Sequence, residues 1–237
     1  MGDERVATRF AMYAAAGMAA ITTVTFGLAL FAVPISGSNC PSDCIEYPYL
    51  DTLDRFPRDY VWMFFAIGLV VTYLIFTISL NKVRTGAGSA IPGQVAVGLA
   101  VVVVAVLVPT YFVQFSVVPS SLSAGQTEGI SLLTQYNPQG LFIALEEIGF
   151  LLMSFSFLFL IPLIPAEGTR ARVVRWLFGA GFVVSGLAFV AIAIAFGFDR
   201  QDRFEIVVIS VTWLVLIVNG VLLSLVFRSR LQDGTDL

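Results

Sequence analysis

Two adjacent glutamates, Glu146 and Glu147, interrupt an apolar run that extends over residues 139–164. Asn137 and Pro138 precede the run and are favoured at the N-cap and the first position of a helix. If the run is a helix that crosses a membrane, a rise of about 1.5 Å per residue places both carboxyl groups roughly 10–12 Å below its starting face. A charged residue at the centre of a bilayer costs on the order of 2.5–3.5 kcal/mol by insertion scales, so such residues are functional candidates by default. The pair therefore predicts a proton- or cation-binding site.

The two carboxyl groups are expected to have different roles, because successive helical residues point about 100° apart. The helix row through Glu147 has smaller and more polar side chains than the row through Glu146. We therefore expect Glu147 to face the bundle interior as the proton or cation carrier, with Glu146 at its margin as a modulator. No lysine or arginine occurs at that depth in an apolar run. We expect no cationic partner, and a proton shared between the two carboxyl groups.

Hydroxyl groups are expected to surround the glutamates. Counting residues inward from the same face of the neighbouring runs finds a polar layer that consists of Thr25, Thr72, Thr110, Tyr111 and Thr212. Such groups could support a functional site. They could equally form a structural network around a neutral glutamate pair, since interhelical polar bonds are common and contribute about 0.6 kcal/mol on average.

The composition determines where such a site must lie. Of the 237 residues, 58% are hydrophobic and 12% are charged, whereas an ordinary soluble domain has about 25% charged residues. This excludes a soluble enzyme, a disordered chain and a nucleic-acid binder, and it predicts an all-α integral membrane protein. The chain has no histidine and a single lysine, Lys82, so histidine-ligated metals and haem are excluded. We expect neither a metal ion nor a cofactor.

Six long apolar runs predict a bundle of six transmembrane helices in a single membrane domain over residues 1–237. Each run has about 21 to 26 residues, enough to cross a hydrocarbon core, and in lipid such runs must be helices. The first is expected to be a retained helix, because its apolar part is too long for a signal peptide. The expected spans are residues 10–33, 60–80, 94–115, 139–164, 173–196 and 205–227.

Basic residues predict the orientation, because they are enriched in cytoplasmic segments. With the N-terminus inside, the inner segments contain Arg5, Arg9, Lys82, Arg84, Arg170, Arg172, Arg175, Arg228 and Arg230. The outer segments contain Arg55, Arg58, Arg200 and Arg203. Both termini are therefore expected to be cytoplasmic, in a plasma or inner membrane. Residues 34–59 and 116–138 are then the two long outer loops.

Cys40 and Cys44 lie in the first of these outer loops. An extracytoplasmic compartment is oxidising, and a turn over Pro41 could bring the two Cα atoms within bonding range. We expect a structural disulfide. A redox-active or metal-binding pair is the alternative, but three residues separate the cysteines and no histidine could complete a zinc site.

Three functions are compatible with the sequence. The first is a small transporter or channel-like protein that carries a proton or small cation at the glutamates, with Tyr111 and Thr212 as supports. The second is a membrane-embedded enzyme that uses a protonated glutamate as general acid on a lipid or isoprenoid. The third is a non-catalytic scaffold or accessory subunit. The expected partners are the lipid bilayer and such a substrate, not nucleic acid, and a homo-oligomer remains open.

Overall fold

The computed structural model describes residues 2–32, 40, 42, 44–83, 90–165 and 167–233. This part of the chain is helical, without a β-strand, and six of its helices are long and apolar enough to cross a membrane. The prediction of six helical spans is confirmed to that extent. The six helices are α1 (Gly2–Phe31), α2 (Val61–Lys82), α3 (Ile91–Ser116), α6 (Leu141–Leu160), α7 (Thr169–Phe196) and α9 (Ser210–Asp233).

The first helix begins earlier than its apolar run does. The sequence places the start of the span near Phe10, whereas α1 begins at Gly2. Asp3 and Glu4 lie in its first turn, where negative charge interacts favourably with the helix dipole. Hydropathy measures how much of a helix suits lipid, and a helix can continue beyond that part.

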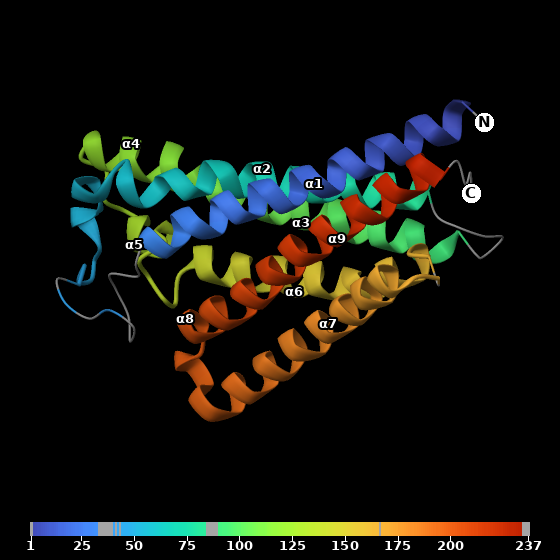
Figure 1. Cartoon of the computed structure of the whole chain (residues 1–237). Coiled ribbons are helices and arrows are strands. Elements are labelled where there is room, and N and C mark those ends of the chain that lie inside the picture. Colours follow the sequence, from blue (N-terminus) through green and yellow to red (C-terminus); the bar gives the residue numbers. More distant parts are fainter. Residues whose placement is uncertain are drawn as a thin grey trace.

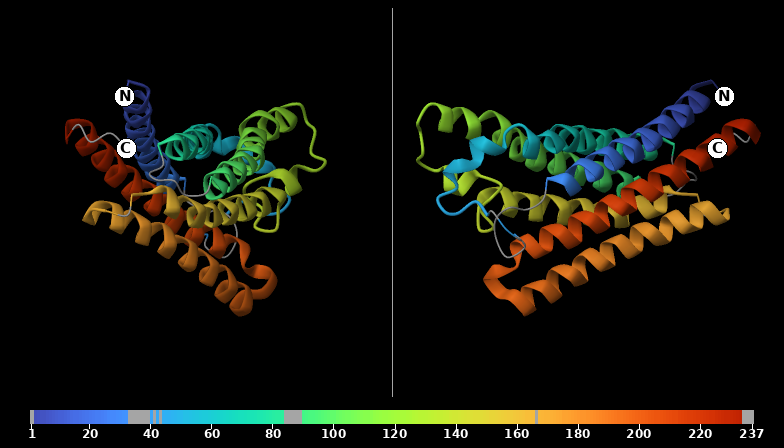
Figure 2. Two further views of the ribbon diagram at one scale, coloured as in Figure 1. Left: turned by 90° about the vertical axis from the view of Figure 1, so that its right-hand side faces the viewer. Right: turned by 60° about the vertical axis from the view of Figure 1, so that its left-hand side comes forward.

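The six helices form a ring. Each packs on the next one along the chain, and α9 closes the ring by packing on α1 (Figures 1 and 2). The segment with the largest buried fraction is α6, and the one with the smallest is α7. The glutamates are therefore on the most enclosed helix of the bundle.

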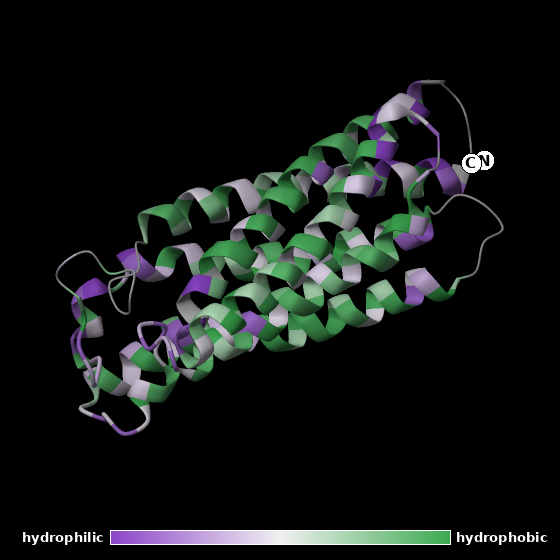
Figure 3. Ribbon diagram, turned by 90° about the horizontal axis from the view of Figure 1, so that it is seen from below, coloured by the Kyte–Doolittle hydropathy of each residue, from purple (hydrophilic) through white to green (hydrophobic). Residues whose placement is uncertain are grey.

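The two ends of the bundle differ in content. Both termini lie at one end, which we call the terminal end (Figure 1). The other end contains Cys40, Cys44 and most of the short helices between the spans, and we call it the disulfide end; the short helix η4 (Ile161–Leu163), which connects α6 to α7, lies at the terminal end (Figure 1). Hydrophilic residues gather at both ends, and hydrophobic residues cover the length between them (Figure 3). This distribution suits a helical bundle surrounded by lipid.

Short helices occupy much of the two long loops at the disulfide end. They are η2 (Leu50–Arg55), η3 (Arg58–Tyr60), α4 (Val118–Ser123) and α5 (Ile130–Leu133). Asp59 joins the two loops: its carboxylate accepts a bond from Arg58 Nε at 2.6 Å and one from Tyr136 Oη at 3.2 Å. Burial, followed by the proximity of Tyr60 and Asp59, raises the pKa of Tyr136. Tyr136 therefore remains a neutral donor, and the loops are held together above the bundle.

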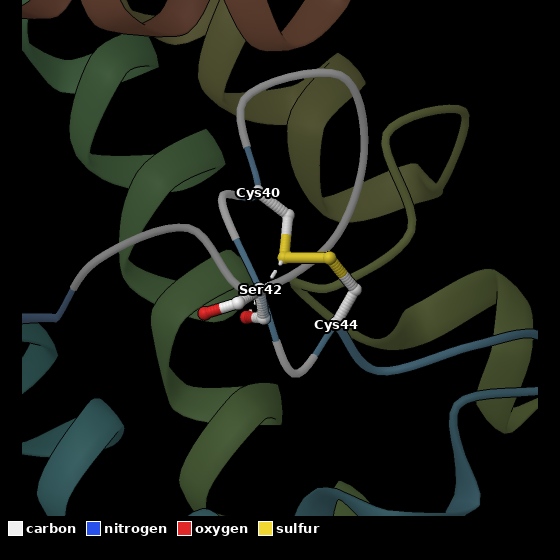
Figure 4. Close-up of a disulfide and its surroundings, with 3 residues drawn as sticks. All are labelled: Cys40, Ser42 and Cys44. Carbon is white, nitrogen blue, oxygen red and sulfur yellow. Dashed lines mark hydrogen bonds between the residues drawn. A yellow bond between two sulfur atoms is a disulfide. The ribbon is translucent and has the colours of Figure 1, made fainter.

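The first loop contains the expected disulfide. Cys40 and Cys44 are bonded to each other with their Cα atoms 5.9 Å apart, and the carbonyl oxygen of Ser42 lies 3.4 Å from Cys40 Sγ (Figure 4). Neither thiol is then available as a metal ligand.

The connection from α7 to α9 folds back onto the N-terminal part of α6, at the disulfide end. It comprises η5 (Gly197–Asp199), α8 (Gln201–Phe204) and the π-helical turn η6 (Glu205–Ile209). Gly197 has a φ of 55°, a conformation that glycine adopts without steric cost. Both α8 and η6 pack on α6. The connection therefore brings loop residues beside the helix that carries the glutamates.

Candidate functional site

The two glutamates lie in the second turn of α6. Gly140 is the extended residue before this helix, and Glu146 and Glu147 follow after a single turn. Glu146 is 1% exposed and Glu147 is 8% exposed. Removing carboxylates from solvent to this extent is costly unless each finds a polar partner.

The partner of Glu146 is Tyr111. The phenol oxygen of Tyr111 donates a hydrogen bond of 2.6 Å to Oε1 of Glu146. Tyr111 is fully buried on α3, two residues after Pro109, which lies inside the helix. This bond links α3 to α6 within the core.

The partner of Glu147 is Arg200. Nε of Arg200 lies 3.2 Å from Oε1 of Glu147, within hydrogen-bond range. Arg200 is the residue between η5 and α8, and its guanidinium also lies 5.8 Å from the centre of the Phe189 ring. The side chain of Arg200 is 29% exposed, so the ion pair lies where the buried core meets the outer part of the protein.

This ion pair contradicts the expectation that no cationic group reaches the glutamates. The expectation counts depth along each apolar run separately, and it assigns Arg200 to a loop outside the membrane. In the structure the connection after α7 turns back onto α6, which lets a long arginine side chain reach the second turn of that helix. The shortness of the segment between the last two spans is the sequence signal that could have suggested this.

The expected facing of the two glutamates is also reversed. Glu146, not Glu147, is the more enclosed of the two. The reason is that the bulkier row of α6 forms the core: Ile143, Phe150 and Met153 lie on the same row as Glu146 and are all buried. Membrane helices associate through van der Waals packing and polar bonds rather than through removal of apolar surface from water, and large side chains make many such packing contacts in the bundle interior.

The expected polar layer is only partly assembled around the carboxyl groups. Tyr111 binds Glu146 as described. The hydroxyls of Thr25 and Thr110 instead bond to carbonyls of their own helices, those of Ile21 and Val106.

The two remaining threonines have other surroundings. Thr72 faces α1, where its methyl group lies 3.9 Å from the position a Cβ would take at Gly17. Thr212 is fully buried, and its hydroxyl has no hydrogen-bond partner among the described residues. Equal depth in different helices does not establish that the side chains face one another.

An aromatic cluster, which sequence reasoning missed, surrounds the Tyr111 ring. The rings of Trp62 and Phe142 lie with centroids 5.4 and 6.0 Å from that of Tyr111. Trp213 of α9 lies 6.3 Å from Trp62 and 6.1 Å from Phe150. The cluster thus spans α2, α3, α6 and α9. These aromatic residues lie far apart in the sequence, and the packing of the six helices into a closed bundle brings their side chains together.

Asp59 with its partners Arg58 and Tyr136, and the disulfide, belong to the loops and not to the glutamate site. Within the described residues, no group of three or more metal-ligating side chains is present. The arrangement therefore offers two differently partnered carboxyl groups, one phenol and one guanidinium.

No family model matches the chain, and no curated protein and no solved structure shows significant similarity to it.

Proposed function

We propose that this chain is a small transporter or channel-like protein that carries a proton or a small cation at Glu146 and Glu147. It would reside in the plasma or inner membrane, with both termini cytoplasmic and the disulfide end outside. One observation supports the proposal above the others. Two adjacent carboxyl groups occupy different settings, since Glu146 is enclosed with the Tyr111 phenol and Glu147 is paired with a partly exposed Arg200.

The roles of the glutamates follow from these settings. Glu146 is assigned as the carrier, because it is the more enclosed of the two carboxyl groups and is bonded to the buried Tyr111 phenol. Glu147 and Arg200 form the gate on the disulfide side. A proton or cation that arrives from that side competes with Arg200 for the Glu147 carboxylate. When it binds, the ion pair weakens and the route to Glu146 opens.

Flux through reconstituted protein tests this proposal. Vesicles that contain the full chain and an internal pH dye are given a proton, sodium or potassium gradient. We expect wild-type flux above that of protein-free vesicles, and we expect Glu146→Gln to return the flux to the protein-free level. Glu128→Gln is the matched control, because Glu128 is an exposed loop residue and its substitution removes the same charge. Flux that Glu146→Gln leaves unchanged would contradict the proposal.

A scaffold or accessory subunit is the second candidate. The observation in its favour is that each carboxyl group already has a protein partner that links α6 to another segment of the fold. A scaffold predicts no wild-type flux under any of the three gradients. It also predicts that Glu146→Gln lowers the unfolding temperature of the purified protein.

A further inference from the structure

A second polar site lies at the terminal end, far along the helices from the glutamates. An open pocket of about 430 Å³ lies between the start of α7 and the end of α9. Its polar lining comes from Glu167, Thr169 and Arg170 on one side and from Ser229 and Arg230 on the other. This pocket contains none of the residues assigned to the proposed transport site.

The charge of the pocket favours an anion. Two guanidinium groups, those of Arg170 and Arg230, line it together with one carboxylate, that of Glu167. Nη1 of Arg230 is buried and has no hydrogen-bond partner among the described residues. A buried guanidinium donor without an acceptor is costly, and an anionic oxygen in the pocket would supply the acceptor.

The backbone adds donors to the same pocket. Gly168 precedes α7 and provides no side-chain cap, and the first turn of α7 contains no acidic residue. The first N–H groups of a helix have no partner within it, and this helix end attracts negative charge. Thr169, Arg170 and Ala171 all contribute to the pocket lining. Arginine forks together with backbone N–H groups are suited to the several acceptor oxygens of a phosphate.

The position of the pocket indicates where the phosphate comes from. The apolar run on α7 begins near residue 173, and the apolar run on α9 ends near residue 227. The pocket is lined by residues 167–171, 226, 229 and 230, which lie at these two limits, so we place it where lipid headgroups meet the hydrocarbon. Its volume exceeds that of one phosphate ion and suits a whole headgroup, since small-molecule pockets start at about 300 Å³. Basic pockets between helices at this height bind anionic lipid headgroups.

We propose that the pocket between the start of α7 and the end of α9 binds the phosphate of an anionic phospholipid headgroup, held by Arg170, Arg230 and the first backbone N–H groups of α7. The bound lipid would join α7, the spanning helix with the smallest buried fraction, to α9 at the terminal end.

Lipid binding to the purified full-length chain tests this proposal, with phosphatidylglycerol and phosphatidylcholine as probes and native mass spectrometry as the readout. We expect Arg170→Gln and Arg230→Gln each to weaken phosphatidylglycerol binding on the order of tenfold, the effect of losing a charge-assisted hydrogen bond. The matched controls are Arg172→Gln and Arg228→Gln. They remove the same charge from neighbouring exposed positions outside the pocket lining, and we expect them to have little effect.

The outcomes separate the alternatives. An equal loss of binding in the controls, or equal binding of both lipids by the wild type, would overturn the proposal. Inorganic phosphate is added as a competitor. Displacement of the lipid by phosphate at millimolar concentration would support a phosphate site filled by the free ion, and resistance to it would support the lipid headgroup. The unfolding temperature of each variant without lipid verifies that the fold is retained.

Discussion

At the scale of residues, the hydrogen-bond partner of each buried carboxyl group determines the free-energy cost of burying it. Glu146 receives its bond from a phenol that is itself fully buried, so neither partner could turn to solvent if the other were lost. Glu147 differs, because Arg200 has a partly exposed side chain and water can replace it. The two glutamates should therefore respond to loss of their partners with different free-energy costs.

Tyr111→Phe removes the phenol oxygen and preserves the ring in the aromatic cluster. We expect the free energy of unfolding to fall by about 1–3 kcal/mol, because the buried carboxyl group loses the hydrogen bond from Tyr111. Thermal or denaturant unfolding in detergent measures the change. Tyr13→Phe is the control, since Tyr13 is 63% exposed on α1. Equal stability of the two variants would contradict the assigned role of Tyr111.

The Glu147–Arg200 pair is expected to contribute less. A double-mutant cycle of Glu147→Gln and Arg200→Gln should give a coupling free energy of about 1 kcal/mol, in the range of pairs that are partly screened by solvent. The coupling should decrease as the salt concentration rises, because exposed charges are screened. A coupling near zero at low salt would mean that the ion pair does not form in solution.

At the scale of elements, the closure of the ring depends on a close approach of α1 and α9. A Cβ added at Gly220 of α9 would lie 2.6 Å from the carbonyl oxygen of Ala15 and 2.9 Å from the Cβ of Ala19. The backbone of α1 cannot yield as a flexible side chain does. Small residues are the usual means by which membrane helices approach this closely.

Gly220→Ala should therefore separate α9 from α1. We expect a loss of about 1–3 kcal/mol in unfolding free energy, typical of overpacking, measured by unfolding in detergent. Gly98→Ala is the matched control, because a Cβ at Gly98 would meet nothing within 4 Å and alanine is the better helix former. If both substitutions are equally tolerated, the close contact between α1 and α9 is not present in solution.

For the whole molecule, the features that could be predicted from the sequence are those that a single segment determines by itself. The six apolar runs determine six helices, and their even number agrees with termini at the same end (Figure 1). Packing between segments is what the sequence could not supply. The return of Arg200 to α6 and the burial of Glu146 beside bulky residues both depend on how separate elements meet. Contacts between segments that are far apart in the chain leave no periodic pattern in a single sequence.

The orientation of the whole bundle has a direct test, because Cys40 and Cys44 are the only two cysteines of the chain. If the disulfide end is outside, a membrane-impermeant maleimide should label intact cells after treatment with an impermeant reductant, and should fail to label them without it. Thr169→Cys in a chain with both native cysteines replaced by serine provides the control. Thr169 is exposed at the terminal end, and the new thiol should react only after permeabilisation. Labelling of the native cysteines without reduction would contradict the disulfide. Labelling of Thr169→Cys in intact cells would reverse the orientation, and with it the side from which the Glu147–Arg200 gate is reached.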